Sequence, residues 1–432
     1  MLGLGIDVGT SGVRVAAVDG AGRVAAEART PLAREPAREG AMAGDARAVD
    51  AESWWRAAER TLDAALDTLG ARRAEVGAIA VDGTSGSVVL VDADARPVTA
   101  GLLYDAGGFE AEGACIDGAA PPASIARGAN SALARVLRLA ADAPDARALC
   151  HQADFVAARL LGRPGLSDES NALKTGYDPR ARRWPDWIAE TGLSLRLLPE
   201  VRPVGAALGP VAPAMCRRLG LPEGALVVAG ASDGTAAFLG ATDGEAAPGT
   251  AVTSLGTTLT LKVASARPVE DVARGVYSHR VGDAWLPGGA SNTGGGALLT
   301  RFPPERIAAL SERIDPRAEP AFDAYPLAAP GERFPLNDPD LAPRMGPAPT
   351  GDPDRDAAIL HALLHAVARI ERAGYETLHA LGAPLPTRVL TSGGGAANAA
   401  WTAMRERILG VPIEAAAADP AIGMARLALR AL

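Results

Sequence analysis

The first residues that could do chemistry lie at the start of the chain, where an apolar run ends in Asp7 and a turn over Gly9–Gly12 follows. Glycines let backbone N–H groups approach an anion closely, and the hydroxyls of Thr10 and Ser11 can donate hydrogen bonds to it. A carboxylate beside a phosphate cradle usually manages Mg²⁺ through oxygen ligands or ordered water. Since a second apolar run, Val13–Val18, leaves the turn, the segment predicts a nucleotide-phosphate site on a β-hairpin.

Two other kinds of phosphate site fit this segment less well. A dinucleotide fingerprint needs a strand before its first glycine and a helix after it, but Gly3 almost begins the chain and a strand-like run follows Gly9. A P-loop needs a lysine in a GK[ST] context, and neither of the two lysines, Lys174 and Lys262, has that context. One glycine turn alone could be a simple tight hairpin. The phosphate interpretation is favoured because similar turns recur along the chain.

Further apolar, strand-like runs are joined to turns of small polar residues. They are Val76–Val81 before Asp82–Gly86, Ala225–Gly230 before Ala231–Thr235, the two arms around Ser254–Thr258, and Val389–Thr391 before Gly393–Asn398. This recurrence predicts two similar halves, which naturally face each other across a ligand-binding cleft. We expect one domain over residues 1–224 and a second over 225–432. A final helix over 421–432 is expected to pack back on the first domain.

Helices are predicted where apolar residues recur with helical spacing. The predicted helices cover 52–69, with Asp50 as a candidate N-cap, 131–141, 144–161, which Gly162 would end, and 355–381. Residues 105–130 are small and irregular, and residues 315–355 are rich in proline. We expect both of these stretches to lack regular structure.

The bulk composition narrows the class of protein. The chain has 432 residues, of which 48% are hydrophobic, enough for sizeable cores. A net charge of −8 without a basic tract argues against nucleic acid and anionic membranes as partners. The three cysteines are far apart and odd in number, as expected for reduced thiols in a cytoplasm. No secretory signal or membrane-spanning run is expected, and a monomer or homodimer is expected.

Four motifs, spread over nearly the whole chain, resemble those of the FGGY carbohydrate kinases, within the sugar kinase/Hsp70/actin class of ATPases. They are Gly5–Ser11 (GIDVGTS), Gly230–Ala237 (GASDGTAA), Ser254–Thr258 (SLGTT) and Ser392–Asn398 (SGGGAAN), in the family's order. The resemblance implies an α/β fold of two ribonuclease H-like (actin-like ATPase) domains with a central cleft. It also implies a sugar and ATP as the small-molecule partners, with Mg²⁺.

The chain departs from many family members at the second hairpin. They carry a Gln-(Met)-His-Gly tip there, whereas this chain reads Asp82–Gly86 (DGTSG), and their Trp-x-Asp-x-Arg element is replaced by Leu102–Ala106 (LLYDA). The cyanobacterial- and plant-type D-ribulose kinases resemble this chain at that tip. They are also similar at Asn171–Asp178 (NALKTGYD) and Gly331–Pro335 (GERFP). The resemblance therefore points to a ketopentose substrate, D-ribulose first and D-xylulose second.

The family pattern implies roles for individual residues. Asp233 would be the general base that takes the proton of the attacking sugar hydroxyl. Asp7 would orient Mg²⁺ through water and also touch the sugar, and Ser85 is the candidate sugar contact on the second hairpin. The remaining implied positions hold ATP: Thr10, Ser11 and Gly12 the γ-phosphoryl group, Gly256, Thr257 and Thr258 the other phosphates, and Gly394, Gly395 and Asn398 the adenosine.

Plainer interpretations compete with these roles. Asp233 could cap a helix that begins near Thr235, which is compatible with catalysis. Ser85 could be a simple turn serine, and Gly394 and Gly395 could form a helix start that merely packs. For the whole protein, an actin- or Hsp70-like ATPase module and a catalytically silent sugar-binding protein are the alternatives, because one fold serves many functions.

Overall fold

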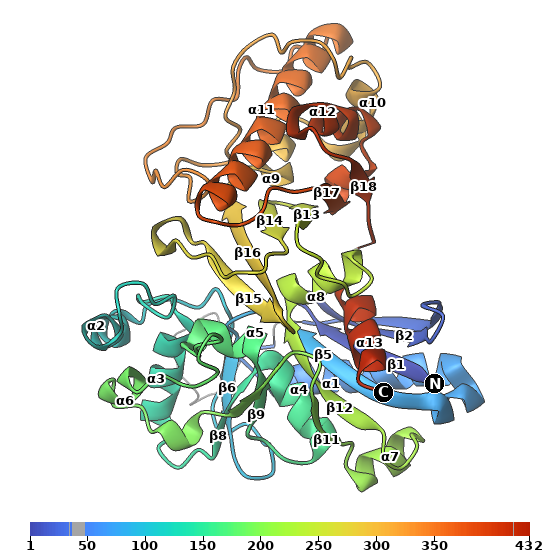
Figure 1. The fold of residues 1–432 in the computed structure, drawn as a ribbon, viewed down its shortest axis with the longest axis vertical. Coiled ribbons are helices and arrows are strands. Elements are labelled where there is room, and N and C mark those ends of the chain that lie inside the picture. The colour runs from blue at the N-terminus through green and yellow to red at the C-terminus, as the bar shows by residue number, and fades with distance from the viewer. Residues whose placement is uncertain (34, 37–47, 418) are drawn as a thin grey trace. The chain divides into compact units, whose positions relative to one another are not determined.

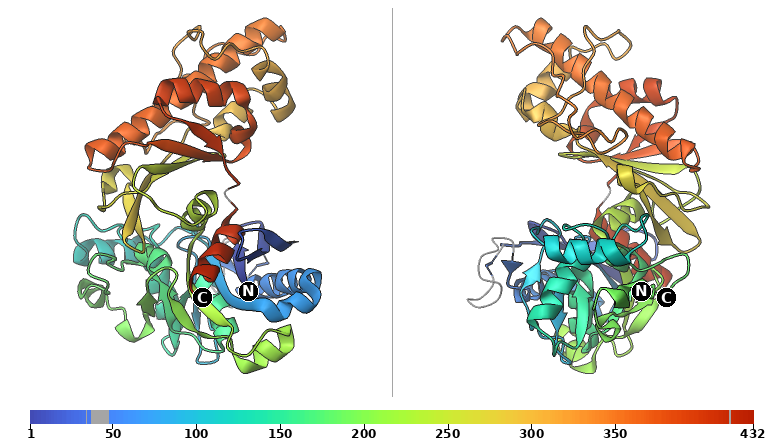
Figure 2. Two further views of the ribbon diagram at one scale, coloured as in Figure 1. Left: turned by 45° about the vertical axis from the view of Figure 1, so that its right-hand side comes forward. Right: turned by 90° about the vertical axis from the view of Figure 1, so that its left-hand side faces the viewer.

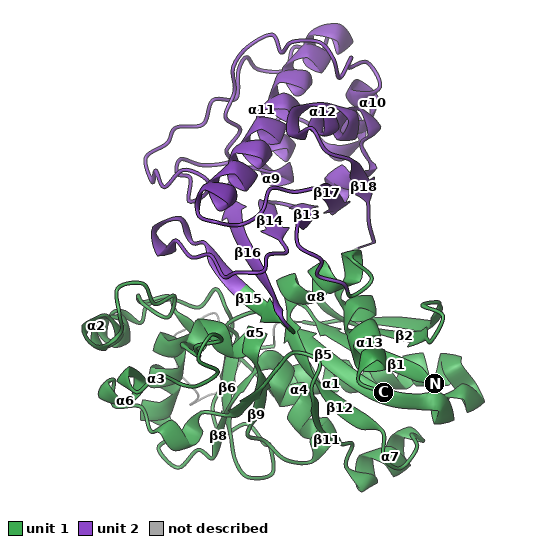
Figure 3. Ribbon diagram, viewed as in Figure 1, with its two compact units in different colours: residues 1–244, 279–282, 419–432 green, residues 245–278, 283–418 purple. Residues whose placement is uncertain are grey.

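The computed structural model describes residues 1–33, 35–36, 48–417 and 419–432 (Figure 1). Packing divides the chain into two compact units, coloured separately in Figure 3. Unit 1 holds residues 1–244, 279–282 and 419–432, and unit 2 holds residues 245–278 and 283–418. The final segment 419–432 thus packs within unit 1, which by this measure extends past residue 224 to Gly244.

Unit 1 is built on a six-stranded sheet with the order β11-β12-β5-β1-β2-β3. The strands are β1 (Leu2–Val8), β2 (Gly12–Asp19), β3 (Val24–Pro31), β5 (Val76–Gly83), β11 (Ala207–Pro210) and β12 (Leu226–Ser232). Strands β1, β2 and β3 form an antiparallel meander, and β5 and β12 run parallel to β1. Every residue of β1 is buried, as expected for a parallel strand covered on both faces. The carboxyl ends of β1, β5 and β12 therefore share one edge.

The rest of unit 1 surrounds this sheet and adds two smaller ones, of order β4-β7-β6-β8 and β10-β9. The additional strands are β4 (Ala48–Val49), β6 (Val88–Val91), β7 (Gly101–Leu102), β8 (Ala148–His151), β9 (Leu166–Asp168) and β10 (Glu200–Arg202). The helices are α1 (Glu52–Leu69), α2 (Glu110–Ala119), α3 (Ala132–Asp142), α4 (Gln152–Leu161), α5 (Glu169–Ala172), α6 (Trp187–Glu190), α7 (Pro213–Leu219), α8 (Asp233–Ala241) and α13 (Pro420–Arg430).

Helix α13 lies directly on β1, and glycines make this contact possible. A Cβ at Gly3 would stand 2.2 Å from the carbonyl oxygen of Ala425, and one at Gly5 would stand 1.8 Å from that of Ala421. No side chain fits such distances, so glycine is required at both positions. The close contact brings Asp419, which caps α13 through the N–H of Ala421, to the edge where β1 ends.

Unit 2 repeats this arrangement around a sheet of order β15-β16-β14-β13-β17-β18. Its strands are β13 (Thr250–Leu255), β14 (Leu259–Val263), β16 (Ala284–Ser291), β17 (Arg388–Ser392) and β18 (Ile413–Ala415). The edge strand β15 (Tyr277–Val281) begins in unit 2, and its residues 279–281 are counted with unit 1. Its helices are α9 (Gly295–Leu299), α10 (Pro304–Ser311), α11 (Pro353–Ala380) and α12 (Ala399–Leu409). The long helix α11 buries Leu360, Leu363, Leu364 and Val367 in the core of the unit, and it packs beside α12 (Figure 2).

The two sheets share one topology. In each, an antiparallel run of three strands (β1-β2-β3 or β13-β14-β16) is extended on its first strand by two parallel strands (β5-β12 or β17-β18). The predicted α/β fold of two ribonuclease H-like, actin-like units is therefore confirmed. Among the described residues, no helix has both the length and the apolar character needed to cross a bilayer.

Most predicted elements are confirmed, including the helices over 52–69 and 355–381 and the helix end at Gly162, but three predictions are wrong. The predicted helix over 144–161 begins only at Gln152, because Ala148–His151 pairs with β6 as a strand. Residues 105–130 contain helix α2, which Glu112 ties to Arg138 of α3. The N-cap of α1 is Ala51, and Asp50 accepts the N–H of Glu52 from one position earlier.

Candidate active site

Three carboxylates meet at the edge of unit 1 where its parallel strands end. Asp7 and Asp82 are register partners on β1 and β5, and Asp233 begins α8 directly after β12. Asp7 and Asp82 are buried, with 6% and 0% of their surfaces exposed, while Asp233 is half-buried. A nitrogen of Arg14 lies 3.8 Å from Asp7 and 3.9 Å from Asp419. This edge therefore concentrates negative charge beside one arginine.

The carboxylates change one another's affinity for protons. Burial, together with the negative charges of Asp7 and Asp233, raises the pKa of Asp82 well above its usual range. Burial raises the pKa of Asp7 to about 6, although Arg14 and a hydrogen bond with Asp82 lower it. No donor among the described residues reaches either oxygen of Asp82. The hydrogen bond between the two carboxyls raises the pKa of Asp82 and lowers that of Asp7. Opposite shifts of this kind are expected when Asp82 holds the proton and donates it to the Asp7 carboxylate.

The hairpin turn between β1 and β2 stands next to Asp7. The Gly9 N–H donates to the carbonyl of Gly12 at 3.0 Å, which closes the turn. Thr10 and Gly12 are half-buried and Ser11 is exposed. The turn thus carries two hydroxyl groups beside a carboxylate, which are donors suited to a phosphoryl group.

At the second hairpin, which follows β5, the Thr84 hydroxyl is hydrogen-bonded to another described residue and the Ser85 hydroxyl is not. Thr84 is fixed by Gln152, whose Oε1 accepts from the Thr84 N–H at 2.9 Å and from its hydroxyl at 2.7 Å. The Ser85 Oγ is buried, and no hydrogen-bond partner reaches it among the described residues. This hydroxyl remains available for a ligand.

Asp233 is positioned by the backbone around it. Its Oδ1 accepts the N–H of Gly234 at 2.7 Å, and Ser232 occupies the N-cap position of α8. Ser232 is in turn fixed by Ser170, whose Oγ accepts the Ser232 N–H at 3.1 Å and lies 2.9 Å from the Ser232 Oγ. The second Asp233 oxygen is not used by these contacts, so it can accept a proton.

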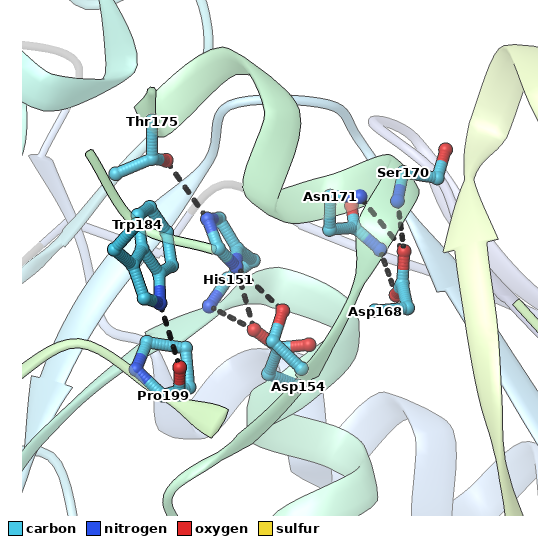
Figure 4. A network of polar contacts seen from close by, with 9 residues as sticks. His151, Asp154, Asp168, Ser170, Asn171, Thr175, Trp184 and Pro199 are labelled. Atoms are coloured by element: carbon cyan, nitrogen blue, oxygen red, sulfur yellow. Dashed lines mark hydrogen bonds and ion pairs between the residues drawn. The ribbon is translucent and has the colours of Figure 1, made fainter. Parts of the chain in front are cut away.

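Ser170 belongs to a segment that is held by a buried polar network (Figure 4). Asp168 caps α5 by accepting the N–H groups of Ser170 and Asn171, each at 2.8 Å. His151 lies 2.6 Å from Asp154 and 2.9 Å from the hydroxyl of Thr175. Burial, with the charge of Asp154, raises the pKa of Asp168 to about 6. The network fixes the segment from Asp168 to Thr175, which includes the Ser170 that holds Ser232.

Unit 2 contains a cavity of about 650 Å³. It is lined by Gly256 and Thr257, by Gly295 and Gly296 at the start of α9, by Leu298, Leu299, Pro304, Ile307, Ala308 and Ser311, and by Gly394, Gly395, Asn398 and Trp401. A mostly apolar cavity with a few polar groups and glycine turns suits a nucleotide. Thr258 adjoins this lining without belonging to it.

Asn398 is fixed at the wall of this cavity. Its Oδ1 accepts the N–H of Trp401 at 3.0 Å, and its amide nitrogen donates to the hydroxyl of Ser311 at 2.8 Å. The side chain therefore caps α12 while it lines the cavity, and one of its amide hydrogens stays available for a ligand.

The structure thus places the predicted site residues in two groups. Unit 1 holds Asp7, Thr10, Ser11, Gly12, Ser85 and Asp233, and unit 2 holds Gly256, Thr257, Thr258, Gly394, Gly395 and Asn398. Sequence reasoning assigned no role to Arg14, Asp82 or Asp419. Its position at the end of a parallel strand could have marked Asp82 as a candidate site residue. Its pairing with Asp7, however, depends on the register between β1 and β5.

The donor set around Asp7 suits a magnesium ion held partly by water. Carboxylate oxygens are hard ligands, and Mg²⁺ usually takes one or two of them together with waters and substrate phosphates. Within the described part of the chain, no group of three or more His, Cys, Asp or Glu side chains could hold a metal ion by itself.

Paired ribonuclease H-like units, one with a carboxylate edge and one with a nucleotide-sized cavity, define an ATP-dependent phosphotransferase of the actin-like class. Family models match two parts of the chain: the N-terminal domain of the FGGY carbohydrate kinases at residues 2–109 and their C-terminal domain at residues 251–432. The chain therefore belongs to the FGGY family, and it is an ATP-dependent carbohydrate kinase.

Individual relatives agree with this assignment. The chain is 28% identical to a xylulose kinase of Streptomyces coelicolor, over 95% of this chain and 83% of that protein. It is 26% identical to a xylulose kinase of Escherichia coli, over 98% of this chain and 89% of that protein. The crystal structure of a xylulose kinase from Rhodospirillum rubrum superposes with a TM-score of 0.83 at 23% identity, covering 99% of this chain and 89% of that one.

Proposed function

We propose that this carbohydrate kinase transfers the γ-phosphoryl group of ATP to a ketopentose, with D-ribulose as the first candidate and D-ribulose 5-phosphate as its product. The observation that carries the proposal is the edge of unit 1, where Asp7, Asp233 and the unpaired Ser85 hydroxyl end neighbouring strands and turns. Carboxylates and hydroxyls of this kind bind and deprotonate a polyhydroxy substrate. The Asp82–Gly86 tip, in place of a Gln-His tip, favours D-ribulose.

In this proposal Asp233 is the general base. Its free oxygen accepts the proton of the attacking sugar hydroxyl while the sugar oxygen attacks the γ-phosphorus. The bond from the γ-phosphorus to the bridging oxygen breaks, and ADP leaves. The hydroxyls of Thr10 and Ser11 and the backbone of Gly12 hold the phosphoryl group as it moves. Asp7 would hold a bound Mg²⁺ through water, and the ion would supply neutralisation of the charge on the phosphates.

The nucleotide is proposed to occupy the cavity of unit 2. Gly256, Thr257 and Thr258 would hold its phosphates at the turn between β13 and β14. Gly394, Gly395 and Asn398 would line its adenosine at the start of α12. In this proposal the sugar-binding domain is residues 1–224, extended by residues 225–244 and 419–432 that pack in the same unit, and the rest of 225–432 is the ATP-binding domain.

D-Xylulose is the second candidate substrate, because all three relatives reported above are named xylulose kinase. The two sugars differ in the configuration of one hydroxyl. At identities of 28% and 26%, the residues that contact the sugar can differ between this chain and those two xylulose kinases. The second hairpin is one place for such a difference.

The test is the kcat/KM of the purified enzyme with Mg-ATP for D-ribulose, D-xylulose, L-ribulose, L-xylulose, D-fructose and glycerol. We expect the highest value for D-ribulose, and ³¹P NMR should place the new phosphate on the 5-oxygen. A higher value for D-xylulose would replace the first candidate by the second. Highest activity on glycerol or D-fructose would refute the ketopentose proposal.

A further inference from the structure

One buried carboxylate of unit 2 accepts hydrogen bonds from five donors. Glu332 is 2% exposed. Its Oε1 accepts the N–H groups of Asn292 at 2.7 Å, Arg333 at 2.9 Å and Phe334 at 3.3 Å. Its Oε2 accepts the hydroxyls of Ser291 at 2.5 Å and Tyr325 at 2.9 Å. All five partners are neutral groups. Hydrogen bonds to an ionised carboxylate are about twice as strong as those between neutral groups.

Two of these donors, Ser291 and Asn292, belong to the glycine loop Ser291–Gly296, which runs from the last residue of β16 into the first turn of α9. They lie forty-one and forty residues from Glu332 in sequence. The same loop is tied to the Glu332 segment a second time, because the Asn292 side chain donates to the carbonyl of Gly331 at 3.0 Å. Ser291 in turn restrains Thr293, because the Ser291 Oγ accepts the N–H of Thr293 at 3.1 Å. The start of the loop is thus fixed from one side by Glu332.

The far end of the loop lies directly on the turn between β13 and β14. The N–H of Gly295 donates to the carbonyl of Gly256 at 2.8 Å, and that of Gly296 donates to the carbonyl of Thr257 at 3.0 Å. A Cβ at Gly294 would stand 2.8 Å from the carbonyl carbon of Thr258. With no room for a side chain between them, the loop and the turn must move together. Gly256, Thr257, Gly295 and Gly296 all line the cavity.

The segment that carries Glu332 has its own anchor. Phe334 is fully buried, and its ring occupies the space where Gly289 of β16 and Gly374 of α11 lack a Cβ. Packing of Phe334 therefore fixes the backbone that carries Glu332. Glu332 can then restrain the glycine loop through its hydrogen bonds.

We propose that Glu332 is a positioning residue for the nucleotide, which fixes the loop Ser291–Gly296 and through it the phosphate-binding turn of unit 2. The inference rests on the proposed nucleotide site in the cavity of unit 2. Glu332 touches no substrate itself. Its removal should weaken nucleotide binding and leave sugar binding intact.

The test is calorimetric titration of the full chain with Mg-ADP, together with steady-state KM values for ATP and the sugar. For Glu332→Gln we expect at least about a tenfold rise in the ADP dissociation constant and in the KM for ATP, and a sugar KM within twofold of wild type. The matched control is Tyr325→Phe. It removes one donor from the same carboxylate without touching the loop, so it should lower the thermal midpoint but leave ADP binding within twofold.

Ser291→Ala gives a second route if Glu332→Gln does not fold. It deletes only the loop-side hydroxyl and should also weaken ADP binding with the sugar KM unchanged. The inference is overturned if wild type binds ADP and these variants bind it equally well, or if the sugar KM rises as much as that for ATP. Failure of wild type to bind ADP would overturn the proposed nucleotide site, and this inference with it.

Discussion

The substitution Asp82→Asn should stabilise the substrate-free protein, and more so as the pH rises. The ordinary pKa of this carboxyl is 3.8, and burial beside Asp7 and Asp233 raises it well above that value in the folded state. Between these two values the unfolded chain is ionised and the folded chain is protonated, so folding takes up one proton. The stability from protonated Asp82 is complete below pH 3.8 and is lost as the pH rises toward the folded pKa.

The size of the pH dependence follows from the uptake of one proton per molecule on folding. Within that window the wild type loses about 1.4 kcal/mol of unfolding free energy per pH unit relative to a variant that does not titrate. Asparagine has the shape of the acid, and its amide can donate to Asp7 in place of the acid proton. The difference corresponds to roughly 3 °C in the thermal midpoint per pH unit for a domain of this size.

The assay is differential scanning fluorimetry of both proteins from pH 5 to 8 without ligands. The two proteins differ only at residue 82, so a difference between them that grows with pH reports the Asp82 carboxyl together with its coupling to Asp7. Asp94→Asn, on a surface turn where that side chain is 70% exposed, is the control and should show no trend with pH. A difference between Asp82→Asn and wild type that stays constant with pH, or a variant less stable throughout, would refute the reasoning.

Two further substitutions test roles assigned above, and a third tests a buried ion pair of unit 2. Thr10→Ala should lower kcat at least about tenfold, because a hydrogen bond to a moving phosphoryl group is lost, while the sugar KM changes less; an unchanged rate would contradict the assignment. Ser85→Ala should weaken sugar binding about fivefold with ATP binding kept, and wild-type sugar affinity would remove Ser85 from the site. Arg405→Ala should cost about 3–5 kcal/mol in unfolding free energy, because Glu371, fully buried, accepts two of its hydrogen bonds at 2.6 and 2.7 Å; a loss below about 1 kcal/mol by urea unfolding would be inconsistent with that account.

The sequence predicted those parts of the fold whose signal is local. Apolar runs that end in Gly-Thr turns identified β1, β5 and β13, and helical periodicity identified α1 and α11. The strand β8 was missed because Ala148–His151 is a short apolar run that continues into α4 with no turn residue between them, and its pairing with Val88–Val91 is not local. Helix α2 was missed because its glycines, Gly113 and Gly118, favour irregular structure, whereas packing of Ile116 stabilises it.

The candidate site was predictable where a motif carries the residue and not where packing creates the contact. Asp7, Asp233 and the glycine turns stand in recognisable segments. The raised pKa of Asp82 depends on the register between β1 and β5 and on complete burial. Glu332 stood in a recognised motif, yet its partner Ser291 lies forty-one residues away, and only the folded chain brings the two together.

The central claim is that Asp233 is the base of a sugar-dependent phosphoryl transfer, and ADP release by wild type and Asp233→Asn tests it most directly. Both proteins should show equal thermal midpoints and equal Mg-ADP binding by calorimetry. We expect wild type to release ADP only when a ketopentose is added, and the variant to lose that rate by a factor of about 10²–10⁴. Sugar-dependent ADP release that survives in the variant, or release by wild type at a rate that no sugar changes, would contradict the account.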